Sequence, residues 1–175
     1  MSKTVNKLDG FAGVNELRKR FVSMYASEAI AKGDCVALDF SATEPTHGYG
    51  NHVRIARLQT ATIMSSQAAL GNHIVGVAAE AITSGEVGSI QVYGHCTFAK
   101  CSDIASAFDG GSAALSDSDE GCILTSSEEA GHFGAYDSSA AMGVGGDSFM
   151  AAILIEYGTA DTADSTVWLL NPANL

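Results

Sequence analysis

Alternating apolar and polar residues predict short β-strands over most of the chain from residue 30 onward. The clearest case is SIQVYGHCTF, residues 89–98. Successive side chains of a strand point to opposite faces, so this segment has one apolar and one polar face, as a half-buried strand does. The apolar face holds Ile90, Val92, Gly94, Cys96 and Phe98, and the polar face holds Gln91, Tyr93, His95 and Thr97.

Further strand-like runs occur at CVALDF, HIVGVAAEA, GCILTS, FMAAILIEY and TVWLL, with glycine-bearing turns or polar loops between them. Gly85 and Gly88 flank a tight turn, whereas Gly76 and Gly94 lie inside strands, where a missing side chain permits a bend or a close backbone approach. The βαβα alternation of a parallel fold is missing. Seven or eight short strands with long connections predict a mainly β domain, a small antiparallel barrel or sandwich.

The N-terminal segment has a different period. Apolar residues recur there at spacings of three and four, with Arg18, Lys19 and Arg20 between them, which predicts a short amphipathic helix. Such a short helix is only marginally stable in isolation, so it must pack against another surface. We therefore expect an N-terminal helical arm, residues 1–29, and a β-domain with a C-terminal tail strand, residues 30–175, that stays folded when residues 1–25 are removed. The apolar positions of the arm are Val14, Leu17, Phe21 and Tyr25.

Charge is divided unevenly along the chain. The net charge is −11, yet residues 1–57 carry +2 and residues 58–175 carry −13 with a single lysine. A body this acidic repels nucleic acid and anionic membranes, because phosphate binding needs clustered lysine and arginine. The chain has neither an apolar run of about 20 residues nor a signal-peptide pattern at its start. We expect synthesis in a cytoplasm and no membrane or nucleic-acid partner.

Candidate chemistry centres on the adjacent His95 and Cys96. They point to opposite faces of a strand and cannot form a nucleophile–base pair, which needs contact at about 3 Å. Zinc ligands usually come in close pairs, whereas the cysteine spacings here are 61, 5 and 21 residues. The loop histidines His47 and His52 lack a nearby carboxylate, and residues 116–121 and 143–147 lack the full patterns of calcium and phosphate loops. We expect no catalytic site, no metal and no cofactor.

Four segments carry a resemblance to a known family: AKGDCVAL (31–38), IVGVAAEAITSGEVGSIQVYG (74–94), GSAALSDSDEG (111–121) and AMGVGGDSFMAAILIEY (141–157). Their order resembles that of the small capsid decoration, or cement, proteins of tailed phages. Those proteins have a G-D-x-V strand, an I-x-G-V-A strand, a G-x-x-G turn, a V-x-V-x-G strand and a G-x-x-L-x-x-D-x-x-G step. The chain departs from them in its longer arm, in the insertion around residues 46–64 and in its tail after Tyr157.

The resemblance implies a structural virion protein on the capsid exterior that ties neighbouring major capsid protein subunits together. It also implies a homotrimer at local three-fold positions. The arm would then contact a neighbouring copy or the coat protein. The candidate assembly contacts are Leu17, Arg18, Lys19, Arg20, Phe21 and Tyr25.

Two other functions remain open at this point. Another virion surface β-module, such as a fibre, knob or glycan-binding module, would group exposed aromatic rings as a sugar platform, for which Tyr49, Tyr136 and Trp168 are the candidates. A hydrolase using cysteine, histidine and aspartate would need a reactive thiol of low pKa.

Overall fold

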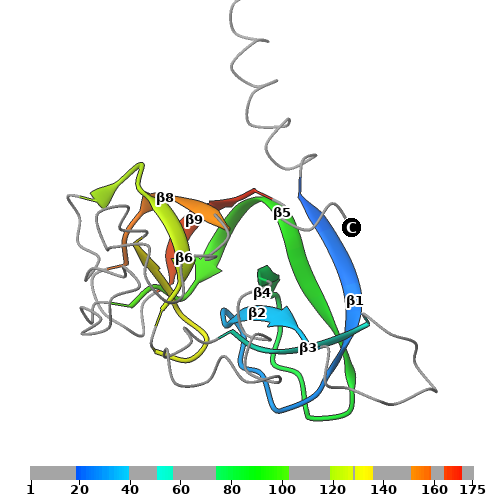
Figure 1. Ribbon diagram of the computed structural model, residues 1–175. Helices are drawn as coiled ribbons and strands as arrows, with labels where there is room; N and C mark the ends of the chain where they lie inside the picture. The colour runs from blue at the N-terminus through cyan, green and yellow to red at the C-terminus, as the bar shows by residue number, and fades with distance from the viewer. Residues whose placement is uncertain are drawn as a thin grey trace, which may run out of the picture.

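The computed structural model describes residues 19–39, 51–56, 74–102, 119–127, 129–135, 151–158 and 164–170 (Figure 1). These residues form β-strands joined by turns and bends, so the prediction of a mainly β fold is confirmed. The strands are β1 (Arg20–Ala26), β2 (Cys35–Leu38), β3 (His52–Ile55), β4 (Ile74–Ala78), β5 (Val87–Ala99), β6 (Ile123–Ser126), β7 (Phe133–Ala135), β8 (Ala152–Glu156) and β9 (Ser165–Leu169).

Five strands close into a barrel in the order β1-β3-β2-β4-β5, and β5 pairs back with β1. The β1–β3 pair is parallel and the other pairs are antiparallel. Closure leaves these strands without open edges, which is a common way for small β proteins to avoid pairing with other chains. Of the predicted antiparallel barrel or sandwich, the barrel is therefore confirmed, but it is not fully antiparallel because β1 and β3 run parallel.

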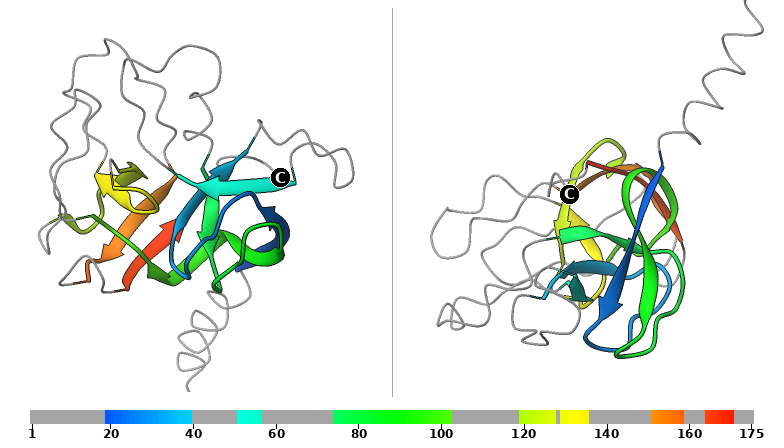
Figure 2. Two further views of the ribbon diagram at one scale, coloured as in Figure 1. Left: turned by 90° about the horizontal axis from the view of Figure 1, so that it is seen from below. Right: turned by 90° about the vertical axis from the view of Figure 1, so that its right-hand side faces the viewer.

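A second sheet continues from the same long strand. The later half of β5 pairs with β9, followed by β8, β6 and β7, all antiparallel (Figures 1 and 2). Tyr93 still pairs with Arg20 of β1, whereas Gly94 already pairs with Leu169 of β9. Gly94 has a φ of +89°, a conformation that is inexpensive only for glycine. The positive φ lies where β5 leaves the barrel.

Two apolar clusters fill the structure. One lies inside the barrel and includes Met24, Val36 and Ile90. The other joins the inner face of the second sheet to the outside of the barrel and includes Cys35 and Phe133. The neighbours Cys35 and Val36 face different clusters, because successive side chains of β2 point to opposite faces. Strand β2 is thus buried on both sides.

The predicted N-terminal helix is wrong for the residues that the structure describes. Arg20–Ala26 is strand β1 of the barrel, with Phe21 opposite Gln91 and Tyr25 opposite Val87 on β5. Residues four apart share a face both in a helix and in a strand, so the spacing of Phe21 and Tyr25 fits either structure. Val14 and Leu17 lie outside the described residues.

The polar face predicted for β5 also needs a correction at Gln91. This side chain is fully buried, whereas Tyr93 and His95 are partly exposed and Thr97 is exposed. Its Nε2 donates hydrogen bonds to the carbonyl oxygens of Tyr93 (3.3 Å) and His95 (2.9 Å). The amide thereby satisfies the backbone on both sides of Gly94. Gln91 lies opposite Val77 of β4, which belongs to the cluster between the barrel and the second sheet, and alternation alone does not reveal this neighbour.

Candidate functional site

The structure separates His95 from Cys96, as the strand pattern predicted. Cys96 is fully buried in the cluster between the barrel and the second sheet. His95 is partly exposed and lies opposite Trp168 of β9. Burial raises the pKa of the Cys96 thiol to about 11, and a backbone hydrogen bond only partly offsets this effect. The interpretation of Cys96 as a core residue is confirmed.

The four cysteines, scattered along the sequence, converge around the same cluster. Cys35, Cys96 and Cys101 are buried members, Cys122 packs against them, and all four thiols are free. Burial is the main cause of the raised pKa of Cys35, and the nearby Cys101 adds to it. Within the described residues, no group of three or more His, Cys, Asp or Glu side chains is placed to hold a metal ion.

Native thiol labelling should separate Cys122 from the other cysteines. Because Cys122 is partly exposed and the other three are buried, we expect a thiol reagent such as Ellman's reagent to modify Cys122 first. Cys35, Cys96 and Cys101 should react only after denaturation. Mass spectrometry of peptides from the labelled native protein is the measurement. Rapid native labelling of Cys96 would contradict the burial of this thiol.

Raised thiol pKa values also predict alkaline destabilisation. The unfolded chain loses these protons near pH 9, whereas burial raises the pKa in the folded state to about 11 for Cys96 and about 12 for Cys101. The free energy of unfolding should therefore fall as the pH rises from 9 toward 12, by up to about 1.4 kcal/mol per pH unit for each such thiol.

The measurement is urea unfolding under reducing conditions at several pH values. The Cys96→Ala variant should have a shallower pH slope than the wild-type protein, because it lacks one buried thiol. An equal slope in both proteins would show that Cys96 does not contribute.

A row of apolar and aromatic side chains crosses the solvent-facing side of five neighbouring strands. Residues directly opposite each other on paired strands share a face, and three such pairs define the row. Trp168 of β9 lies opposite His95 of β5 and opposite Ile153 of β8, and Ile153 lies opposite Ile123 of β6. The ring of Tyr93 meets that of Trp168 edge-on, with centroids 6.1 Å apart.

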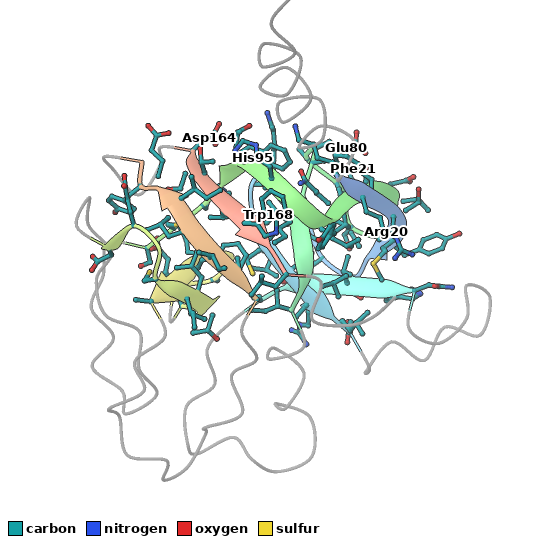
Figure 3. All side chains as sticks on the ribbon, turned by 90° about the horizontal axis from the view of Figure 1, so that it is seen from above. Arg20, Phe21, Glu80, His95, Asp164 and Trp168 are labelled. Carbon is teal, nitrogen blue, oxygen red and sulfur yellow. The ribbon has the colours of Figure 1, made fainter. Side chains whose placement is uncertain are left out.

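On β1 the row ends at Phe21. The residue before it, Arg20, lies opposite Tyr93, and Phe21 itself lies opposite Gln91. Phe21 is 47% exposed and Ile123, at the other end, is 36% exposed. In Figure 3, Trp168 lies beside His95, and Phe21 lies farther toward the right of the view, near Arg20. We call this row the outer stripe; it consists of Phe21, Tyr93, His95, Trp168, Ile153 and Ile123.

The two ends of the outer stripe carry opposite charges. Lys19 and Arg20 stand at the β1 end, next to Phe21. Glu156 lies at the β8 end, opposite Thr166 and therefore on the face of Trp168. The turn containing Glu120 lies beside β8, because the backbone N–H of Gly121 donates to the carbonyl of Leu154 at 2.8 Å. Arg20, Glu120 and Glu156 are exposed.

The structure brings only part of the predicted assembly set together. Arg20 and Phe21 are exposed on β1, and Lys19 directly precedes them. Tyr25 is partly buried and stacks on His52, with ring centroids 5.4 Å apart. Leu17 and Arg18 lie outside the described residues, as do His47 and two of the candidate sugar-platform residues, Tyr49 and Tyr136.

Of the other members of the outer stripe, Trp168 was predicted only as a candidate sugar-platform residue, and Tyr93, His95, Ile153 and Ile123 were not predicted as contact residues. One signal was present in AILIE, where Ile153 and Ile155 alternate with the buried Leu154, so both faces of β8 are apolar. Apolar residues on both faces of a strand indicate that the outer face is covered or binds a partner. The cross-strand neighbours of Ile153 could not be deduced, because they depend on the strand order.

A partly buried ion pair was also missed. Asp34, whose side chain is only 7% exposed, accepts a hydrogen bond from Lys100 Nζ at 2.6 Å and another from the backbone N–H of Ala31 at 2.7 Å. Asp34 directly precedes β2 and Lys100 directly follows β5. The pair therefore joins the turn before β2 to the end of β5 and is part of the scaffold.

No protein-family model matches the chain, and a comparison with curated proteins found no significant match. The described residues contain no helix that is long and apolar enough to cross a bilayer. Function is therefore inferred from the fold, the surface and the motifs of this chain.

Proposed function

We propose that the chain is a structural virion protein that binds the outer surface of a tailed-phage capsid and ties neighbouring major capsid protein subunits together. It acts as a homotrimer on the capsid exterior, without a cofactor and without a catalytic step. The proposal rests on the resemblance to capsid decoration proteins and on the place that the motif residues take in the barrel.

The motif residues that carry the resemblance shape the closed barrel, and this observation carries the proposal. Gly33 of the G-D-x-V motif has a φ of +88°, and Asp34 forms the partly buried ion pair with Lys100. Gly76 of the I-x-G-V-A motif has no room for a side chain against the backbone of Gln91. Gly94 of the V-x-V-x-G motif lies where β5 leaves the barrel. The motifs thus coincide with the points that fix the strand paths.

The charge and the exposed apolar residues of the surface support binding to another protein rather than to a nucleic acid. Residues 1–20 carry +3 and the remaining residues carry −14. A barrel with this charge is repelled by packaged DNA, and this supports a position on the outside of a capsid. The exposed apolar residues of the outer stripe provide surface for protein contacts.

Co-sedimentation tests the proposed function. The purified protein is mixed with mature empty capsids of the phage that encodes it and is separated on a sucrose gradient. We expect the protein to move with the capsids in a saturable amount. In a parallel gradient, duplex DNA in the same mass as the capsids should carry none of the protein with it. Absence of the protein from the capsid fraction at saturating concentration would reject the proposal.

The alternative is another virion surface module, of the fibre, knob or glycan-binding kind. Trp168 and Tyr93 do group on one face, but their rings stand at 79° to each other. A sugar ring stacks on a flat aromatic face, and two rings that meet edge-on do not form one continuous platform. Binding to a glycan array with loss on Trp168→Ala would favour this alternative.

A further inference from the structure

The outer stripe is a row of mostly apolar and aromatic side chains, all partly or fully exposed to solvent. It crosses the four steps from β1 through β5, β9 and β8 to β6. Neighbouring strands lie about 4.8 Å apart, and the stripe also shifts along β5, from Gln91 opposite Phe21 to His95 opposite Trp168. Single exposed apolar residues are ordinary, whereas a row that joins five strands marks a site of protein contact.

Charge suggests what covers this stripe. The β1 end carries Lys19 and Arg20, and the β8 end carries Glu156 with Glu120 nearby. A surface that is apolar along its middle and oppositely charged at its two ends is complementary to another copy of itself. The basic end of one copy can meet the acidic end of the next copy, while their apolar residues exclude water between them.

We propose that the outer stripe is the self-association surface of the protein, with the β1 end of one copy bound to the β8 end of the next. Contacts between two different patches build a closed ring when the rotation between copies closes. The proposal does not rest on binding to a capsid, because self-association is a property of the isolated protein.

Phe21 and Trp168 supply the apolar part of this contact. Aromatic side chains contribute strongly at interfaces because they bury a large area with few rotatable bonds. The exposed Phe21 projects from the basic end, and Trp168 lies in the middle of the stripe between His95 and Ile153. The six residues of the outer stripe are fewer than the roughly 20–30 residues a side of a standard interface, so we expect weak association with dissociation constants in the micromolar range.

Charge reversal with rescue tests the direction of the contact. Sedimentation velocity is measured on the full chain from about 2 to 200 µM. Arg20→Glu and Glu156→Arg should each raise the dissociation constant at least about tenfold, because each places like charges together. The double variant should return it to within about threefold of the wild-type value. Glu86→Arg is the matched control, since Glu86 is exposed in the turn before β5, and it should behave as wild type.

A second pair of variants tests the apolar part. Phe21→Ser should raise the dissociation constant by about tenfold or more. Val87→Ser is its control, because Val87 is 50% exposed on β5 near the opposite end of β1, and it should leave self-association unchanged. Thermal melts of all variants establish that each remains folded.

Three outcomes would overturn the proposal. A wild-type protein that stays monomeric over the whole concentration range has no self-association surface. Failure of the double variant to recover would show that Arg20 and Glu156 do not face each other between copies. An equal effect of Phe21→Ser and Val87→Ser would place the contact elsewhere. Capsid co-sedimentation with a monomeric protein would leave the proposed capsid binding standing, while the homotrimer and this self-association surface would both fail.

Discussion

Removal of residues 1–25 should unfold the β-domain, whereas removal of residues 1–18 should leave it folded. The longer deletion takes away six of the seven residues of β1. β5 then loses its closing partner and the barrel core loses Val22 and Met24. An opened barrel exposes strand edges and apolar interior together, so we expect loss of cooperative unfolding and aggregation.

The two truncated chains are compared by circular dichroism during heating and by gel filtration. The chain beginning at residue 19 should melt cooperatively within a few degrees of the full chain. The chain beginning at residue 26 should show no cooperative melt. A folded protein lacking residues 1–25 would mean that β1 is dispensable, as the sequence pattern of an N-terminal arm had suggested.

Replacing Gly76 by alanine should be among the most destabilising single substitutions in the protein. A Cβ at this position would overlap the carbonyl oxygen of Gln91 and lie 2.8 Å from its carbonyl carbon. The obstructing atoms are backbone of the central strand β5, so they cannot move without disturbing the strand pairs on either side. We expect a loss of more than about 3 kcal/mol in the free energy of unfolding.

Gly121→Ala is the matched control. Gly121 has a φ of +86°, and a Cβ there would meet nothing within 4 Å. This substitution should therefore cost only the backbone strain of about 1 kcal/mol. Denaturant unfolding of the two variants separates steric overlap from backbone strain. Similar losses in both would contradict the close approach of β4 and β5.

Alternation and glycine placement allowed much of the fold to be predicted. The apolar face of residues 89–98 correctly placed Ile90, Val92 and Cys96 in the interior, because the period of a strand determines which side chains share a face. The turn at ITSGEVG was also predicted, and Gly85 has the positive φ of +83° expected there. These features depend on residues that are near one another in the sequence.

Features that depend on strand order could not be predicted. A spacing of four, as between Phe21 and Tyr25, fits a helix and a strand equally, and only pairing with β5 decides between them. Gln91 is fully buried and lies opposite Val77, a member of the cluster between the barrel and the second sheet. The outer stripe joins Trp168 to His95 and Ile153 through pairings that the sequence does not encode locally.

Electron cryomicroscopy of capsids incubated with the protein tests the central proposal most directly. We predict added density on the outer surface at repeated positions between coat subunits, with the closed barrel and the second sheet fitting into it. Capsids incubated without the protein provide the control. Density on the inner surface, or capsids unchanged at saturating protein concentration, would contradict the assignment as a capsid decoration protein.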